Sequence, residues 1–315
     1  MTNTCAAMGF ASKLLMQGGA GPRVFDASSE AYSFLAETLS ADRTTQGRRR
    51  LTGSLEMYDE AFREHSYLPG GAIVLQCSPK DLDNLLPRIL GAAPSGTVFS
   101  PGQSFGGGTG EFDILIDREN GVFRYTDCVV AKVTLRSATE EGNEGQNEEL
   151  VELILYVFCK SETYATAWPA TPPTLTLGGA YAPYAHWEGA LTTNSNNTSY
   201  SEFDLNIDNM MRPIFNNSKT PQCFRPMGRM VTLNTNNPFT TTTLADAQAM
   251  IASGIAGTLT FTNGTLSTLI NFAKLRNNYK SPNVKGRGET RLPFRMIAAA
   301  SSIAPSIKFT NDSTV

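Results

Sequence analysis

Few side chains in this sequence have the type and spacing that catalysis or metal binding requires. The 315 residues include two histidines, His65 and His186, and neither lies near cysteine or a second histidine at a spacing that would hold zinc. A Ser/His/Asp site assembled from distant residues stays open, because sequence alone does not reveal such a site. We expect both histidines to be surface or interface residues, and we expect a protein that is not an enzyme and needs no cofactor.

Asp81 and Asp83 are spaced like an acid–base or metal pair, but their surroundings indicate a helix start. They follow Ser78, whose hydroxyl accepts a free amide of a first turn, and a proline, which needs no amide donor there. Leucine and isoleucine then recur every three or four residues up to Gly91. The pattern predicts a short strand that leads into a capped helix, which kinks or ends early at Pro87.

Two further segments have features of anion-binding sites. The triplet Arg48, Arg49 and Arg50 has the charge for binding phosphate, although a solvated or subunit-contacting face is the more ordinary role. Residues 102–110 are rich in glycine, but they precede a predicted strand and not a helix N-terminus, so the geometry that cradles an anion is missing. We interpret this segment as a flexible connection.

Composition favours two domains with a charge difference between the halves of the chain. The hydrophobic content is 41 %, and no apolar run reaches the roughly 18 residues of a membrane span. Residues 1–160 carry 14 basic and 21 acidic residues (net −7), and residues 161–315 carry 12 and 8 (net +4), which sum to −3. Opposite signs suit self-association. The opening lacks a basic region, so we expect no secretion signal and no disulfides among the five cysteines.

Hydrophobic periodicity predicts a mainly β chain with one helix per domain. Asn120-Gly121 and Asn263-Gly264 are strong hairpin turns. We expect residues 112–117 to be half-buried, residues 151–160 to form a central strand covered on both faces, and Pro293 to mark an edge or bulge. Thr243 with Asp246 resembles the capping pair of a second helix. The other expected strands are 31–39, 72–77, 122–136, 201–208, 229–234 and 289–297, with irregular stretches at 40–70 and 210–227.

The predicted element order occurs twice along the chain. Each half reads strand, long loop, strand, capped helix, strand, Asn-Gly hairpin, strand, charged loop, strand. The proline-rich stretch 168–173 is the best linker. We therefore divide the chain into an N-terminal arm (1–23), a first domain (24–165), a linker (166–180) and a second domain (181–315).

An ordered set of motifs resembles the tail tube proteins of long-tailed bacteriophages, specifically the class with a duplicated tube domain. The resemblance covers roughly residues 51–313. The motifs are SPKDLDNLLPRILG, EFDILIDR, FRYTDCVVAKVTLR, ELILYVFCKSET, GTLTFTNG, SPNVKGRGETRLPF and IKFTNDS. The set in this order is more specific than any single motif, and residues 1–30 and 194–199 match nothing in it.

This resemblance implies a β-sandwich or partial barrel per domain, whose strands join those of neighbours into an oligomeric inner β-barrel. Stacked rings would form the tube that conducts DNA into the host. It implies a trimeric, pseudo-hexameric ring, with a hexamer as the alternative. The implied partners are the tape measure protein, the tail terminator and distal tail proteins, and DNA that passes without specific binding, with no membrane. The protein would be assembled in the bacterial cytoplasm and reside in the virion tail.

Charged loops supply the candidate contact residues. An acidic loop before the last strand of the first domain and a basic loop in the second would be neighbours of opposite sign around a ring. Intra-ring candidates are Glu140, Glu141, Glu144, Lys274, Arg276, Lys280, Lys285 and Arg287. The long loops 40–70 and 210–227 are candidates for contacts between stacked rings. Inter-ring candidates are Arg48, Arg49, Arg50, Glu56, Asp59, Glu60 and Glu64.

The alternative function is a carbohydrate- or receptor-binding β-sandwich of the virion tail. Four aromatic residues, Trp168, Tyr181, Tyr184 and Trp187, would then serve as stacking platforms. Their proline- and glycine-rich surroundings fit a packed linker better.

Overall fold

A computed structural model describes residues 12–19, 23–41, 43, 45–47, 62–103, 105, 109–119, 121–138, 150–165, 167–277 and 290–313. Within these residues the chain is mainly β, with two α-helices. Seventeen strands belong to one hydrogen-bonded sheet, and four others form two separate hairpins. The mainly β prediction is confirmed.

In the first half, the sheet strands pair in the order β3, β6, β10, β9 and β8. Strand β8 continues outward to β1 and β2, and β11 pairs with the beginning of β9. The elements are β1 (Lys13–Gly18), β2 (Glu30–Tyr32), β3 (Ala36–Glu37), β6 (Gly70–Gln76), α1 (Pro79–Leu90), β7 (Val98–Phe99), β8 (Glu111–Asp117), β9 (Val122–Ala138), β10 (Glu152–Phe158) and β11 (Ser161–Ala165).

In the second half, the strands pair in the corresponding order, β14, β17, β20, β19 and β18. Strand β18 continues to β12 and β13, and β21 pairs with the beginning of β19. The elements are β12 (Gly189–Thr193), β13 (Asn196–Thr198), β14 (Glu202–Asp208), β17 (Met230–Pro238), α2 (Thr241–Ala252), β18 (Ile255–Asn263), β19 (Leu266–Asn277), β20 (Arg291–Ala299) and β21 (Ile307–Asp312). The domain boundaries themselves stay a prediction.

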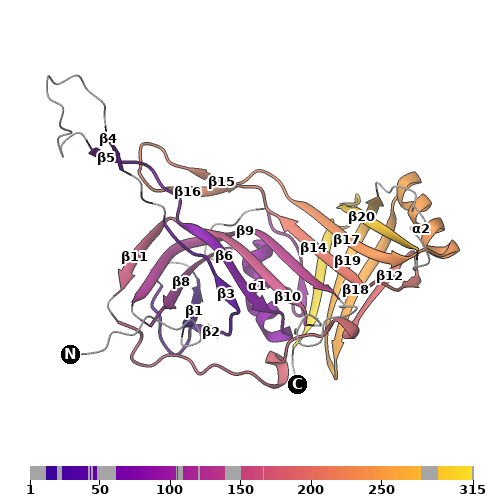
Figure 1. Cartoon of the computed structure of the whole chain (residues 1–315), viewed down its shortest axis with the longest axis horizontal. Coiled ribbons are helices and arrows are strands. Elements are labelled where there is room, and N and C mark those ends of the chain that lie inside the picture. The colour runs from indigo at the N-terminus through magenta and orange to yellow at the C-terminus, as the bar shows by residue number, and fades with distance from the viewer. Residues whose placement is uncertain are drawn as a thin grey trace.

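Strand β9 joins the two halves. Strand β9 has 17 residues. Its N-terminal part pairs with β8, and its residues 132–138 pair antiparallel with residues 202–208 of β14. The sheet therefore runs without a break from the first half into the second (Figure 1). Helix α1 lies near the middle of the molecule, whereas α2 lies at the end away from the first half (Figure 1).

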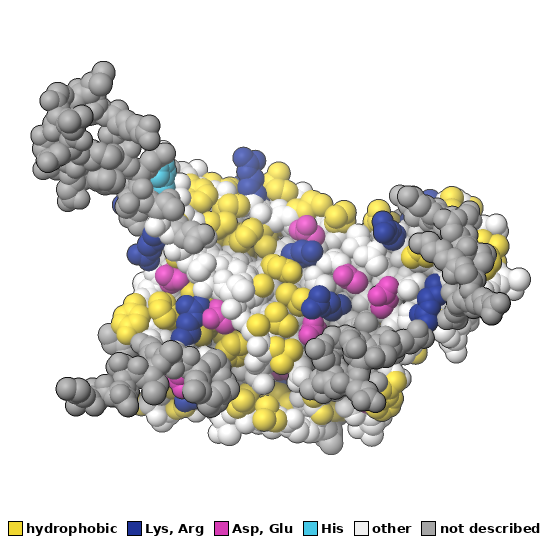
Figure 2. Space-filling model, viewed as in Figure 1, with side chains coloured by type: hydrophobic (Ala, Val, Ile, Leu, Met, Phe, Trp, Pro, Cys, Tyr) yellow, Lys and Arg dark blue, Asp and Glu magenta, His cyan; other side chains and the backbone are white. Residues whose placement is uncertain are grey.

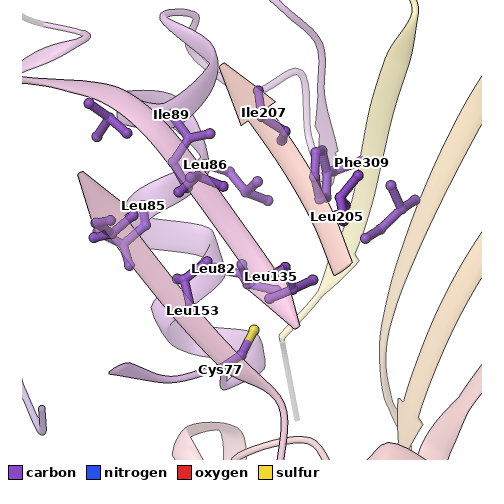
Figure 3. Close-up of a cluster of buried hydrophobic side chains, with 14 of the residues drawn as sticks. Cys77, Leu82, Leu85, Leu86, Ile89, Leu135, Leu153, Leu205, Ile207 and Phe309 are labelled. Carbon is purple, nitrogen blue, oxygen red and sulfur yellow. The ribbon is translucent and has the colours of Figure 1, made fainter. Parts of the chain in front are cut away.

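Helix α1 begins as predicted. The Ser78 hydroxyl accepts the Asp81 amide at 3.1 Å, and Gly91 ends the helix in the left-handed conformation. The expected early end at Pro87 is wrong, because the helix continues to Leu90. Leu86 and Ile89 lie in one buried cluster with Leu205 and Ile207 of β14 (Figure 3).

The expected half-burial of residues 112–117 is wrong. Both faces of β8 are buried, because β1 covers its edge and Leu115 packs with Leu15. Asp113 on that face is neutralised by ion pairs with Arg23 at 3.0 Å and Arg124 at 2.6 Å. Burying a carboxylate is costly unless it is paired, and the two ion pairs of Asp113 offset that cost.

Three other details differ from the predictions. The cap of α2 is Thr240 and not Thr243, since the Thr240 hydroxyl accepts the Thr243 amide at 3.1 Å. The expected strand 31–39 is divided into β2 and β3. The stretch 210–227 contains a hairpin of β15 (Met211–Ile214) and β16 (Cys223–Pro226), and a second hairpin joins β4 (Thr45–Gly47) to β5 (Phe62–Glu64).

The remaining strand predictions are confirmed. Both Asn-Gly hairpins pair as expected, and β10 is central between β6 and β9. Tyr156 is the one exposed side chain of β10, so cover on that face is incomplete. Pro293 pairs with Asn236 of β17 and lies beyond the part of β20 that pairs with β19 in the described residues, so the expected edge or bulge stays a prediction.

Candidate functional site

The described part of the chain shows no metal-type site. No group of three or more histidine, cysteine, aspartate or glutamate side chains is placed to hold an ion in these residues. Neither described helix is long and apolar enough to cross a membrane. Residues 102–106 read Gly-Gln-Ser-Phe-Gly, the spacing of a nucleophilic serine, but the element that follows is strand β8 and not the helix that such a serine turn requires.

His186 is buried, so the expected surface position is wrong for this residue. Its Nδ1 lies 3.2 Å from the Ser137 hydroxyl of β9, and its ring packs against Tyr200 and Phe203. His65 is exposed. His186 therefore serves as a packed residue where the two halves meet.

One face of the continuous sheet is polar and accessible. A row of directly paired residues crosses five strands on this face: Glu152, Arg136, Asp204, Asn234 and Arg295. These residues also line a hollow of about 870 Å³. The alternate residues of the same strands, such as Leu135, Leu205 and Leu233, point into the core. The sheet therefore has one face sealed by its own core and one hollowed face open to solvent.

The charges on this hollowed face balance one another. Arg136 forms an ion pair with Glu152 at 2.8 Å and is paired in register with Asp204 on its other side. Lys132 lies 5.5 Å from the centre of the Tyr156 ring and opposite Asp208. On the face seen in Figure 2, basic and acidic side chains are interspersed without a continuous patch of either sign. Such a face offers no dense basic stripe for phosphates.

The C-terminal end of α1 is held by residues from the second half. Asn209 donates to the Ile89 carbonyl at 2.9 Å, and Arg229 donates to the Leu90 carbonyl at 3.0 Å and to the Asn209 side chain at 2.8 Å. Burial lowers the pKa of Arg229 to about 10. A cation here interacts favourably with the free carbonyls and the negative helix end.

The N-terminal end of α1 is held from the same side. Asn311 of β21 donates to the Pro79 carbonyl at 2.9 Å, and Ser313 bonds to the Asp83 carboxylate. Asp83 therefore contributes to packing between the halves and not to a metal or acid–base pair. We call this set of contacts between α1 and the second half the internal joint.

In the described residues, helix α2 is less covered than α1. Ile89 and Ile251 are each the eleventh residue of a 12-residue helix, yet Ile89 is 1 % exposed and Ile251 is 50 % exposed. Gln248 and Ala252 beside it are also exposed. Among the described elements, those with the most extensive packing against α2 are β18, β19 and β20, all from its own half. We call Gln248, Ile251 and Ala252 the open α2 face.

Strand β3 occupies the same place in the first half as β14 in the second, but its outer edge is not paired with a strand in the described residues. Leu35 next to it is 54 % exposed. The Leu39 amide donates to Glu37 at 2.8 Å, and the Leu39 carbonyl accepts from Arg118 at 2.6 Å. These two side chains, which are ion-paired at 2.7 Å, occupy these main-chain groups together with the buried Tyr125 hydroxyl, which donates to the same carbonyl at 3.0 Å.

The structure places only part of the predicted contact set. Lys274 and Arg276 lie together on β19, against Gly254 after α2. Glu64 belongs to β5. The remaining residues lie outside the described residues: Arg48, Arg49, Arg50, Glu56, Asp59, Glu60, Glu140, Glu141, Glu144, Lys280, Lys285 and Arg287. Sequence reasoning missed Asn209 and Arg229, whose significance depends on their contacts with α1, and Ile251, whose significance depends on its exposure.

The four aromatic residues proposed as stacking platforms have different environments. Tyr184 is fully buried and shares a hydrogen bond with Thr268 at 2.9 Å, so it cannot stack on a ligand. Trp168 packs against the cluster of Leu15 and Leu115. Trp187 is 74 % exposed.

The family model described as phage tail tube protein matches residues 19–298. No curated protein matches the sequence.

Proposed function

This chain belongs to the phage tail tube protein family, and we propose that its copies polymerise as stacked rings into the tube that conducts DNA into the host. The family is one of structural components of the virion tail and not one of enzymes. The observation that carries the proposal is the continuous sheet with a sealed face and a hollowed polar face. Closing such sheets into a barrel would remove their open edges and enclose the polar face.

We further propose that the two halves are tandem tail tube domains, within the boundaries predicted above. The same order of strand pairing in each half supports this. Three chains would then supply six domains to each ring, and a hexamer of chains is the alternative. The mass of an isolated ring distinguishes the two.

The hollowed face is our candidate for the lumen. Arg136 and Lys132 on this face lie beside the carboxylates of Glu152, Asp204 and Asp208, which suits DNA that slides past without a tight electrostatic grip. The tape measure protein would occupy the same channel during assembly, and the tail terminator and distal tail proteins would contact the two ends of the tube.

The charged loops keep their proposed roles. The acidic loop with Glu140, Glu141 and Glu144 would meet the basic loop around the ring, and such rim pairs contribute about 0.2 to 1 kcal/mol each. The long loops would contact the next ring. The chain segments at the two hairpins in these loops are in contact. The Tyr67 amide, just after β5, donates to the Lys219 carbonyl, between β15 and β16, at 2.9 Å.

Negative-stain electron microscopy of the concentrated full chain tests this function. We expect rings and tubes with a central channel. Particles that stay small at every concentration, together with binding to a glycan array, would instead support the carbohydrate-binding alternative, for which Trp187 is the exposed aromatic residue.

A further inference from the structure

We propose that the open α2 face binds the first half of a second copy of this chain, at the β3 edge marked by Leu35, and so builds a head-to-tail joint. This inference rests on the proposed polymerisation and specifies its contact surfaces. The internal joint provides the physical template, because it shows how the end of a helix in one half is covered by the neighbouring half.

Each of the two surfaces could supply the kind of element that the other one is missing. In the internal joint, β14 lies beside β9 and its residues Leu205 and Ile207 share a core with Ile89. The open α2 face has Ile251 at the position of Ile89, and no described strand of the first half packs extensively against it. Strand β3 has the place of β14, no described helix packs extensively against it, and Leu35 beside it is exposed.

A second copy is the occupant that satisfies both surfaces together. Each chain has one open α2 face at one end and one β3 edge in its other half, so the contact repeats from copy to copy. The halves also carry opposite net charges, −7 for residues 1–160 and +4 for residues 161–315, which favours contact between unlike halves. Tyr164 of β11, which is 62 % exposed, adds apolar surface to the first half.

In the single chain, the side chains of Glu37 and Arg118 are already hydrogen-bonded to the main chain beside β3. They bind the main-chain groups of Leu39, just after β3, whose carbonyl also accepts from the buried Tyr125 hydroxyl at 3.0 Å. Docking of the α2 side can therefore begin at Leu35, while strand addition at Leu39 requires this ion pair to rearrange.

Two single substitutions test the joint. Ile251→Asp and Leu35→Asp each place a charge on one proposed surface, at a side chain exposed enough for the fold to tolerate it. We expect each variant alone to lose tube formation by about tenfold or more in a sedimentation assay, because the joint would bury an unpaired carboxylate. Leu177→Asp, at an exposed site outside both surfaces, is the matched control and should assemble like the wild type.

Mixing the two variants gives the decisive result. Ile251→Asp keeps an intact β3 edge and Leu35→Asp keeps an intact α2 face, so an equimolar mixture should form a two-chain complex that stops growing. Mass photometry would detect it. Assembly of Ile251→Asp at the wild-type level, or a mixture that stays monomeric while the wild type forms tubes, would overturn the joint. Failure of the wild type to form rings or tubes would instead refute the proposed function.

Discussion

Replacing the same residue at the same position of the two helices provides a direct test of how the halves are covered. Ile89→Ala removes a buried side chain from α1, and such changes cost about 2–5 kcal/mol of unfolding free energy. Ile251→Ala removes a side chain that is already half in water, so we expect a loss of only about 1 kcal/mol in the single chain.

For assembly, in contrast to the stability of the single chain, we expect Ile251 to matter more than Ile89. If a second copy covers the exposed half of Ile251, roughly 90 Å² of apolar surface leaves water, worth about 2 kcal/mol per joint. Ile251→Ala should then raise the critical concentration for tube formation by about tenfold or more, since about 1.4 kcal/mol corresponds to a factor of ten.

Urea unfolding of dilute protein gives the first quantity, and sedimentation over a concentration series gives the second. The structure requires Ile89→Ala to be the more destabilising change in the single chain. Equal unfolding losses for the two variants, or an unchanged critical concentration for Ile251→Ala, would refute the reasoning. The first result would mean that α2 is covered within one chain.

Three other perturbations address the internal joint, a buried carboxyl and the hollowed face. Arg229→Met should lower the unfolding free energy by about 2–4 kcal/mol in urea, because two buried acceptors lose their donor, whereas Met at the exposed Arg225 should change little. Burial raises the pKa of Asp81 to about 6, above its ordinary 3.8, so the wild type gains stability as the pH falls from 6 towards 4. Asp81→Asn should be the more stable protein at pH 7.5 and lose that advantage at pH 4.5 in parallel urea titrations. Glu152→Gln removes an exposed partner of Arg136 and should change the unfolding free energy by no more than about 1 kcal/mol, yet increase DNA retention by assembled tubes in a low-salt filter assay.

Local signals predicted the elements that local interactions determine. Ser78 and Gly91 set the ends of α1, and Asn263-Gly264 sets a hairpin, because cap and turn geometries depend on a few neighbouring residues. The start of helix α2 could not be predicted from such local signals. Four consecutive threonines lie at its start, each able to cap a helix, and the structure has Thr240 as the cap and the other three as the first turn.

Contacts between distant segments could not be predicted in this way. Nothing in the local sequence indicates that Thr134 meets Asn206, or that Asn209 reaches the end of α1. The burial of Asp113 depends on Arg23, 90 residues earlier in the chain. The candidate surfaces were therefore missed while the family was correctly identified, because they consist of exposed apolar positions whose meaning comes from their counterparts in the other half.

Strand β9 also determines how the two halves move. Its backbone is hydrogen-bonded to β8, β10, β11 and β14, so a hinge between the halves would have to break a ladder of main-chain bonds. If copies assemble into rings as proposed, each copy would bring its two halves at an angle that this shared ladder already holds.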